Sequence, residues 1–171
     1  GSLVAKAIKA DLYENWTDVS GFLVTDPRIV KNPEVIESIT YRELRELSYM
    51  GANVLHPDSI FPVRKNDIPI HIRNTFNPQA KGTMIVSSKK FFSGAYERKE
   101  STVTGIAGKK HFIAINIEKS MMNNELGFAR KVLEVIEKNG LGIEHMPSGI
   151  DTLSVVIDGS NHDEDALERI V

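Results

Sequence analysis

The sequence predicts a mixed α/β protein made of two modules. In residues 1–88, short segments of alternating apolar and polar residues, typical of strands, are separated by segments with helical apolar periodicity. After residue 101 the same kinds of segment recur in the order strand, helix, strand, strand, helix. That order is the one expected of a ferredoxin-like βαββαβ unit that lacks its last strand.

The first module is predicted from local signals along the chain. The patterns indicate a helix end over residues 3–10, strands over 12–18, 68–73 and 83–86, and helices that begin near Thr40 and Pro57. Thr40 and Glu43 have the spacing of a capping box, in which each side chain bonds the backbone of the other residue. Pro57 is favourable in a first helical turn because its missing N–H would be unpaired there in any case.

The second module shows clearer periodicity. Isoleucine at 113, 115 and 117 alternates with smaller or polar residues, which predicts a strand. A helical stripe runs from Leu126 to Ile136, with Glu134 and Lys138 four residues apart on its polar side. Two further strands are expected over residues 142–146 and 153–157, and a second helix from Asp163.

Residues 87–101 interrupt the pattern because they are polar and carry no sustained apolar stripe. We therefore expect one domain over residues 1–88, a linker over 89–101 and a second domain over 102–171. Both ends of the chain fall inside helical patterns, so we expect a piece of a longer protein. Gly1 and Ser2 are either native or a cloning remnant.

Composition excludes several classes of protein. The formal net charge is −2 and both signs are spread along the chain, so neither a nucleic-acid groove nor an anionic membrane surface is expected as a partner. Cysteine is absent, which excludes disulfides and thiolate metal sites. No apolar run approaches the roughly 18 residues of a membrane span. The histidines have no ligand spacing, so no metal site is predicted. We expect a cytoplasmic protein.

Four motifs in order resemble one family. They are Trp16-Thr17-Asp18-Val19 with Thr25-Asp26-Pro27-Arg28, Tyr49 to Pro57, Ile68-Pro69-Ile70, and Arg73 to Pro78 followed by Gly82-Thr83. In sequence and spacing they resemble the nucleotide-side half of aspartate kinases. In the second module, Ser120-Met121-Met122, Gly127-Phe128 and the run from Ile143 to Gly149 resemble the amino-acid-sensing ACT domain of the monofunctional, lysine-sensitive members.

The resemblance implies a reaction and its cofactors. Such enzymes transfer the γ-phosphoryl group of ATP, with Mg²⁺, to the side-chain carboxylate of aspartate, at the entry to lysine, threonine and methionine synthesis. The family's phosphate-gripping lysine-glycine motif and its Gly-Ser-Asp motif have no counterpart in this sequence. We therefore assign no catalytic residue here and expect the 171-residue chain to be inactive by itself.

The resemblance also suggests residues on the nucleotide side. Thr17 and Asp18, at the end of a predicted strand, would border the adenine and ribose, or else only cap the next turn. Arg28 would face phosphate, or else be a solvated loop cation. Leu23 and Asn53 stand where many relatives carry tyrosine and lysine. The second difference removes a positive charge and puts the usual pattern in doubt at Asn53, which could still donate a hydrogen bond to a phosphate or base.

For the effector, a helix N-terminus offers unpaired N–H groups to the carboxylate of an amino acid. By resemblance, the effector residues are Met122, Glu125, Gly127, Phe128, Ala129, Ile143 and Glu144. Glu144 would face the far ammonium, and Glu125 is a second carboxylate nearby, so we expect lysine, alone or jointly with threonine. Glu144 could equally be an exposed strand residue, and Met122 a core residue. The family also implies a homodimer formed through ACT domains.

Two other interpretations stay open. The chain could be part of a stand-alone amino-acid sensor in which the first module is only a scaffold. It could also belong to another amino-acid or nucleotide kinase, although those usually lack the ACT tail. A fused homoserine dehydrogenase is not favoured, because the ACT residues resemble the monofunctional type. The sequence upstream of Gly1 distinguishes the enzyme from the sensor.

Overall fold

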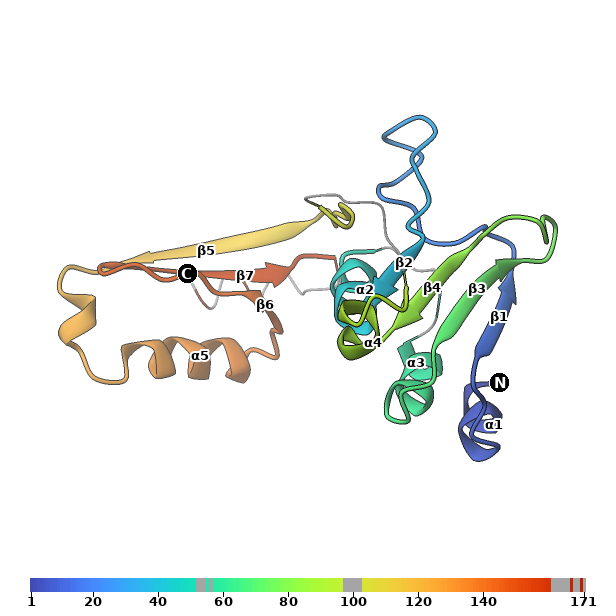
Figure 1. Cartoon of the computed structure of the whole chain (residues 1–171). Coiled ribbons are helices and arrows are strands. Elements are labelled where there is room, and N and C mark those ends of the chain that lie inside the picture. The colour runs from blue at the N-terminus through green and yellow to red at the C-terminus, as the bar shows by residue number, and fades with distance from the viewer. Residues whose placement is uncertain (52–54, 56, 97–102, 161–166, 168–169, 171) are drawn as a thin grey trace. The chain divides into compact units, whose positions relative to one another are not determined.

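A four-stranded mixed sheet organises the first part of the chain, with strand order β1-β3-β4-β2. Its strands are β1 (Tyr13–Thr17), β2 (Ser38–Thr40), β3 (Ile70–Asn74) and β4 (Thr83–Val86). β1 is parallel to β3, β4 is antiparallel to β3, and β2 is parallel to β4. β1 and β3 therefore end at one edge of the sheet, whereas β2 and β4 end at the opposite edge (Figure 1).

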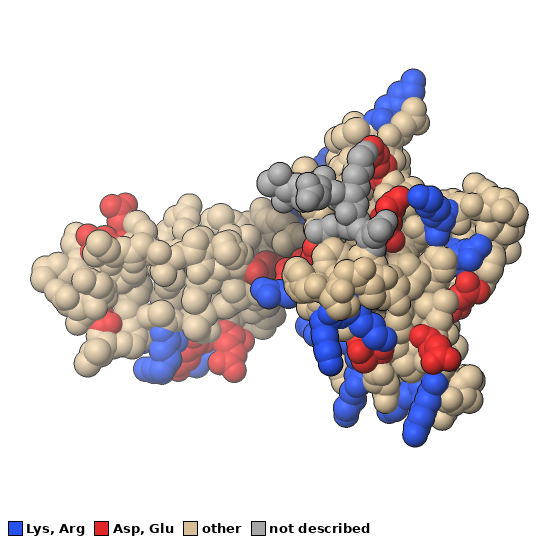
Figure 2. Space-filling view, in the orientation of Figure 1, with Lys and Arg blue, Asp and Glu red and all other residues tan. Residues whose placement is uncertain are grey.

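The computed structural model describes residues 1–51, 55, 57–96, 103–160, 167 and 170. The chain divides into two compact units, residues 1–108 and residues 109–171. Each unit is described separately below. On the visible face of the first unit, basic and acidic side chains are interspersed (Figure 2), in keeping with the small net charge.

The described residues of the first unit form the helices α1 (Ser2–Ala7), α2 (Tyr41–Tyr49), α3 (Pro57–Arg64) and α4 (Ser88–Phe92). The predicted capping box at the start of α2 is confirmed. The amide of Glu43 donates to Thr40 Oγ1 at 3.2 Å, and the amide of Thr40 donates to Glu43 Oε2 at 2.9 Å. These two bonds satisfy donors that a helix start leaves unpaired.

The polar segment 87–101, which carries no sustained apolar stripe, begins with a short helix. Residues Ser88–Phe92 form α4, and Ser87 Oγ accepts a hydrogen bond from the amide of Lys90 at 3.3 Å. A serine N-cap stabilises even a short helix without an apolar stripe.

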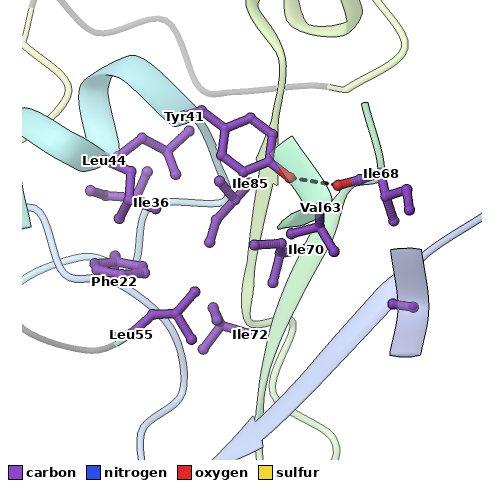
Figure 3. Packing of buried hydrophobic residues seen from close by; sticks show 12 residues of the cluster. Phe22, Ile36, Tyr41, Leu44, Leu55, Val63, Ile68, Ile70, Ile72 and Ile85 are labelled. Carbon is purple, nitrogen blue, oxygen red and sulfur yellow. Dashed lines mark hydrogen bonds between the residues drawn. The ribbon is translucent and has the colours of Figure 1, made fainter. Parts of the chain in front are cut away.

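The core of the first unit lies on one face of the sheet. Ile39, Ile70, Ile72 and Ile85, one or two from each of three strands, are fully buried there. They pack with side chains from the helices and from the loop after β1, including Phe22, Leu44 and Val63 (Figure 3). The Tyr41 hydroxyl donates to the backbone oxygen of Ile68 at 2.5 Å, and burial raises the pKa of that phenol. This bond ties the start of α2 to the segment leading into β3.

A buried threonine joins the sheet to the connection between β1 and β2. The Thr83 side chain is fully buried at the start of β4. Its Oγ1 accepts from the amide of Phe22 at 2.8 Å and donates to the backbone oxygen of Ile36 at 2.6 Å. The amide of Ile36 donates in turn to the backbone oxygen of Phe22 at 2.7 Å. One hydroxyl therefore satisfies two buried backbone groups that lie fourteen residues apart in the connection between β1 and β2.

The second unit is a three-stranded antiparallel sheet with strand order β5-β7-β6. Its elements are β5 (Phe112–Glu118), the 3₁₀ turn η1 (Met122–Asn124), α5 (Phe128–Lys138), β6 (Ile143–His145) and β7 (Thr152–Asp158). Ile136 of α5 packs with Val155 and Ile157 of β7, and Ile113 and Ile115 of β5 complete this cluster. The predicted strand, helix, strand, strand order is confirmed, and its strand order agrees with a ferredoxin-like unit. The helix expected from Asp163 lies outside the described residues.

The division between the units comes later than the predicted start of the second domain at residue 102. Residues 103–106 return to the first unit, where the amide of Ile106 donates to the backbone oxygen of Val24 at 2.7 Å. The sequence pattern does not predict this contact of residues 103–106 with the first unit. A backbone hydrogen bond requires no apolar periodicity in the side chains, and the preceding residues 89–101 are simply polar. The identities of the two domains stay predictions.

Thr83→Val tests the buried hydroxyl. The change leaves the Phe22 amide and the Ile36 carbonyl without their partner, so we expect the free energy of unfolding of the first unit to fall by about 2–4 kcal/mol. Thr83→Ser keeps the hydroxyl and loses one methyl, which should cost about 1 kcal/mol. Denaturant unfolding followed by the fluorescence of Trp16, the single tryptophan, reports on this unit. Equal losses in the two variants would contradict the role given to the hydroxyl.

Candidate functional site

The carboxyl ends of β1 and β3 carry the first group of candidate residues. Thr17 pairs with Asn74 in the parallel register, and the amide of Thr75 donates to the backbone oxygen of Thr17 at 2.8 Å. Asp18 follows directly and is exposed; its Oδ1 accepts from Thr17 Oγ1 at 3.1 Å. In open α/β sheets, ligands bind outside the carboxyl ends of parallel strands. Thr17 and Asp18 occupy that kind of position.

The loop after β1, residues 18–28, is called the candidate nucleotide loop below. Gly21 in this loop has φ +119°, and a Cβ there would lie 2.4 Å from Thr83 Oγ1. Only glycine fits this backbone beside the buried hydroxyl. Leu23 then forms an isolated antiparallel bridge with Val35. The loop is thus attached to the sheet at Phe22, through Thr83 of β4, while Leu23 pairs with the later part of the same connection.

Arg28 lies at the far end of the candidate nucleotide loop. Its side chain is 87% exposed and is paired with Asp26, with 2.6 Å between Nη2 and Oδ2 and 3.0 Å between Nε and Oδ1. The hydrogen bonds from Arg28 lower the pKa of Asp26 to about 2. The guanidinium is therefore already neutralised by a neighbouring carboxylate, which is the geometry of a local loop contact rather than of an open phosphate site.

A cavity of about 440 Å³ lies at the same edge of the sheet as Thr17. Its lining comes from the candidate nucleotide loop, the segment before β2, the turn before β4 and the segment after residue 102: Ser20, Val24, Glu34, Val35, Ile36, Glu37, Ala80, Lys81, Gly82, Val103 and Thr104. Its volume falls within the range typical of small-molecule sites. Of the predicted nucleotide residues, none lines this cavity, and Asn53 lies outside the described residues.

The second group of candidates surrounds the start of α5. Gly127 is the N-cap with φ +77°, no side chain caps this helix, and Phe128 is its first residue. Met122 is buried in the preceding turn. Ala129 is exposed in the first helical turn. An uncapped helix start leaves backbone N–H groups directed outward, as a carboxylate ligand requires.

Glu125 does not offer the free negative charge that the sequence suggested. Its carboxylate binds Lys119 Nζ through one oxygen and Lys131 Nζ through the other, the latter at 2.6 Å. The hydrogen bonds from Lys119 and Lys131 lower the pKa of Glu125 to about 2. Lys119 Nζ also lies 5.1 Å from the centroid of the Phe128 ring. Two lysine ammonium groups thus flank the Glu125 carboxylate, and in the same loop the amide of Met121 donates to Asp151 Oδ1 at 2.8 Å.

Glu144 lies at the other end of the unit. Ile143 pairs with Ile157, whereas the loop before α5 follows Glu118, which pairs with Thr152. Five residues of β7 separate these positions, about 17 Å at roughly 3.3 Å per residue. β6 accordingly lies by the C-terminal end of α5 (Figure 1). Within one chain, the structure does not bring Ile143 and Glu144 to the helix start.

The Glu144 carboxylate has an unusual environment. The residue is half-buried, and its Oε2 is inaccessible to solvent with no hydrogen-bond partner among the described residues. A buried carboxylate oxygen without a donor is costly, so such a group is stabilised by any cation that approaches it. Of the predicted effector residues, Glu144 is the one whose carboxylate is not already paired.

Metal and membrane sites were also considered. Among the residues that the structure describes, no three or more His, Asp or Glu side chains are grouped closely enough to hold a metal ion. None of the described helices combines the length and apolar character that crossing a bilayer requires.

Sequence reasoning missed the side chains that shape the sheet edge. Asn74 Nδ2 donates to Ser20 Oγ at 2.8 Å, and Asn74 Oδ1 accepts from the amide of Phe76 at 2.8 Å. Asn74 is 9% exposed. An asparagine at the end of a buried strand is a signal that could have been used, because its amide must be satisfied there. Thr83 gave no comparable local signal.

Known proteins were compared with the chain once this geometry was established. The model of the amino acid kinase family matches residues 1–74. Aspartokinase 3 of Bacillus subtilis is 43% identical over all 171 residues, which cover 36% of that protein. The aspartate kinase of Clostridium acetobutylicum superimposes with a TM-score of 0.86 at 52% identity, over 99% of this chain and 39% of that one. The chain thus spans less than half the length of these relatives.

A more distant structure shows the same fold. Aspartokinase III of E. coli, in its R-state complex, superimposes with a TM-score of 0.72 at 23% identity, over 99% of this chain and 38% of that one.

The titration of Glu125 tests the charge arrangement at the helix start. Because two lysines lower its pKa, the stability that this carboxylate contributes is complete above pH 4.5 and is lost as the pH falls toward 2. Lys119→Met should move the NMR titration midpoint of Glu125 upward. Lys138→Met, which removes an equal charge beside Glu134 on the same helix, should leave it unchanged. An unmoved midpoint in Lys119→Met would contradict the pairing.

Proposed function

The chain belongs to the aspartokinase family, and on that premise we propose that it forms the nucleotide-side part of an aspartate kinase together with a lysine-responsive ACT domain. The reaction is the transfer of the ATP γ-phosphoryl group to the side-chain carboxylate of aspartate. The observation that supports this most directly is similarity over the whole chain, through both units. Because the chain covers 36% of its Bacillus relative, the activity belongs to a longer polypeptide.

The sheet edge at Thr17, Asp18 and Leu23 is the proposed place of the adenosine. An exposed Asp18 carboxylate is suited to accept hydrogen bonds from ribose hydroxyls, and Leu23 offers an apolar contact to the base. Phosphoryl transfer depends mainly on positioning and on positive charge around the phosphates. In this chain Arg28 is the cation nearest in sequence to those residues, and it must exchange Asp26 for phosphate to act there.

Magnesium is expected with the nucleotide. The described residues hold no cluster of ligands for a metal ion. Mg²⁺ is commonly held by one or two carboxylates together with substrate phosphates and water. In this proposal the exposed Asp18 carboxylate contacts such an ion, whose role when bound would be to offset phosphate charge. The remaining ligands and the phosphate-gripping groups are proposed to come from the polypeptide outside these residues.

Regulation by lysine is proposed for the second unit. Aspartokinase III of E. coli has been solved in complex with aspartate and ADP, and also in complex with lysine and aspartate. In this chain, the uncapped start of α5, with Lys119 and Lys131 nearby, suits the carboxylate of an amino acid. The unpaired Glu144 carboxylate suits an ammonium group.

The two ends of the proposed lysine site are too far apart in one chain to share one ligand. Along β7, roughly 17 Å separates Thr152, which is paired with the end of β5, from Ile157, which is paired with Ile143. Free lysine, with four methylene groups before its ammonium, is shorter than this distance. We place the ligand between two copies, with the helix start from one and Glu144 from the other. Exposed apolar side chains support pairing at this end: Met121, Leu126 and Ile150 are 66%, 96% and 73% exposed.

Asp18→Ala tests the nucleotide side in the intact enzyme. Loss of a charged acceptor for ribose should raise KM for ATP roughly tenfold, with KM for aspartate little changed. Asp11→Ala, an exposed aspartate just before β1, should behave as wild type. Coupled assays of ADP release with aspartate as acceptor measure both constants. If the wild-type enzyme shows no aspartate-dependent ATP turnover, the kinase assignment is wrong. The stand-alone amino-acid sensor would then be the remaining interpretation.

Glu144→Gln tests the effector site. The variant keeps the shape and loses the charge, so lysine should bind and inhibit at least about tenfold more weakly, while uninhibited turnover stays the same. Glu137→Gln changes an exposed glutamate of α5 and should retain wild-type inhibition. Calorimetry with lysine and with threonine measures the affinities. Undiminished lysine binding in Glu144→Gln would exclude the proposed ammonium contact.

A further inference from the structure

A second turn reaches the edge of the sheet at which β1 and β3 end. It consists of residues 75–80, called the β3 turn from here on, and it carries an exposed phenyl ring at Phe76. We propose that this ring stacks on the base of the bound nucleotide and makes the site prefer a purine. This inference rests on the proposed function and adds to it a residue which that function does not use.

The β3 turn lies directly beside the two residues proposed for the adenosine. Thr17 is paired with Asn74, and the amide of Thr75 donates to the backbone oxygen of Thr17 at 2.8 Å. Thr75 thus lies about one strand spacing, roughly 5 Å, from Thr17. Phe76 and Asp18 are the residues that follow these two along the chain. A ligand held at Asp18 is therefore within reach of the phenyl ring.

The backbone that carries the ring is fixed by hydrogen bonds. The amide of Phe76 donates to Asn74 Oδ1 at 2.8 Å, and Arg73 Nη2 donates to the backbone oxygen of Pro78 at 2.6 Å. Asn74 Nδ2 also donates to Ser20 Oγ at 2.8 Å, which holds the β3 turn next to the candidate nucleotide loop. A side chain on a backbone that is already ordered loses less freedom when a ligand binds.

The Phe76 ring is available to a ligand. The residue is 83% exposed, so its ring is not part of the packed core. An apolar ring that stands in water on a fixed turn gains free energy when a flat apolar surface covers it. A purine base provides such a surface.

Trp16 also has an aromatic ring near this edge, but it does not compete with Phe76 for the base. Tyr13 packs against the core, and residues two apart in a strand share a face, so Thr17 lies on the core face and Trp16 on the other. The Trp16 ring is also covered by Arg73, whose Cζ lies 4.9 Å from the ring centroid. The tryptophan is therefore already stacked.

The chemistry of the base follows from these positions. In the proposed function, Asp18 binds the ribose hydroxyls and Leu23 contacts the base. Because Ser20 and Asn74 hold the loop and the turn side by side, the base lies between the loop that carries Leu23 and the turn that carries Phe76. Every base has a π face on which an aromatic side chain can stack. The two fused rings of a purine cover more of the phenyl ring than a pyrimidine does.

The test compares Phe76→Ala with Phe76→Tyr in the intact enzyme, by calorimetry with ADP. In Phe76→Ala, ADP affinity should fall at least about fivefold, because the stacked ring is lost. KM for ATP should rise by a similar factor, whereas KM for aspartate should change little. Phe76→Tyr keeps the ring and should retain wild-type affinity. Phe92→Ala removes another exposed phenyl ring, 82% exposed in α4 after β4, and should also bind ADP as wild type.

NMR of the enzyme with ring-labelled phenylalanine provides a second measurement. Its Phe76 signal is identified by its loss in Phe76→Tyr. Addition of ADP should move that signal upfield, because the ring then lies over the base, while the Phe92 signal should stay in place.

The failure of this inference is distinguishable from the failure of the proposed function. If ADP binds, but Phe76→Ala has wild-type affinity or the Phe76 signal does not move, the stacking role is wrong. Weaker ADP binding in Asp18→Ala would then still support the proposed site of the adenosine. If the wild-type enzyme does not bind ADP, both are wrong.

Discussion

The fully buried hydroxyl of Thr83 is the interaction on which the candidate nucleotide site depends. It bonds Phe22 and Ile36, and so fixes both ends of the β1–β2 connection against the start of β4. Without it, two backbone groups would be buried unpaired, and the candidate nucleotide loop would keep only the bond from Asn74 to Ser20 among these attachments to the sheet. Gly21 is a consequence of this arrangement, because any side chain there would meet the same hydroxyl.

Elsewhere in the chain, too, a single side chain holds more than one partner. Glu43 holds both the start of α2 and Thr104, and Glu125 holds two lysines at the start of α5. Glu43 joins segments 61 residues apart, whereas Glu125 joins lysines six residues to either side of it. The first lies beside the proposed nucleotide loop, and the second beside the proposed effector site. Charged groups thus organise the loops, while apolar packing organises the sheets.

Local patterns were sufficient for much of the fold. The Thr40 capping box and the alternating isoleucines of β5 were correctly predicted, because they depend on spacings of three and two residues. The Thr83 and Asn74 contacts were not, since they join residues 61 and 54 positions apart. Glu125 was interpreted from its charge alone, without its lysine partners. The separation of Glu144 from the helix start depends on strand register, which composition does not reveal.

The central claim is that the nucleotide lies at the edge of the sheet where β1 and β3 end. A crystal structure of the intact enzyme with ADP tests it most directly. The adenosine should lie against Thr17, Asp18 and Leu23, with the phosphates toward the Arg28 end of the loop. Density for ADP at the opposite edge, beside Thr40 and Val86 where β2 and β4 end, would contradict the claim.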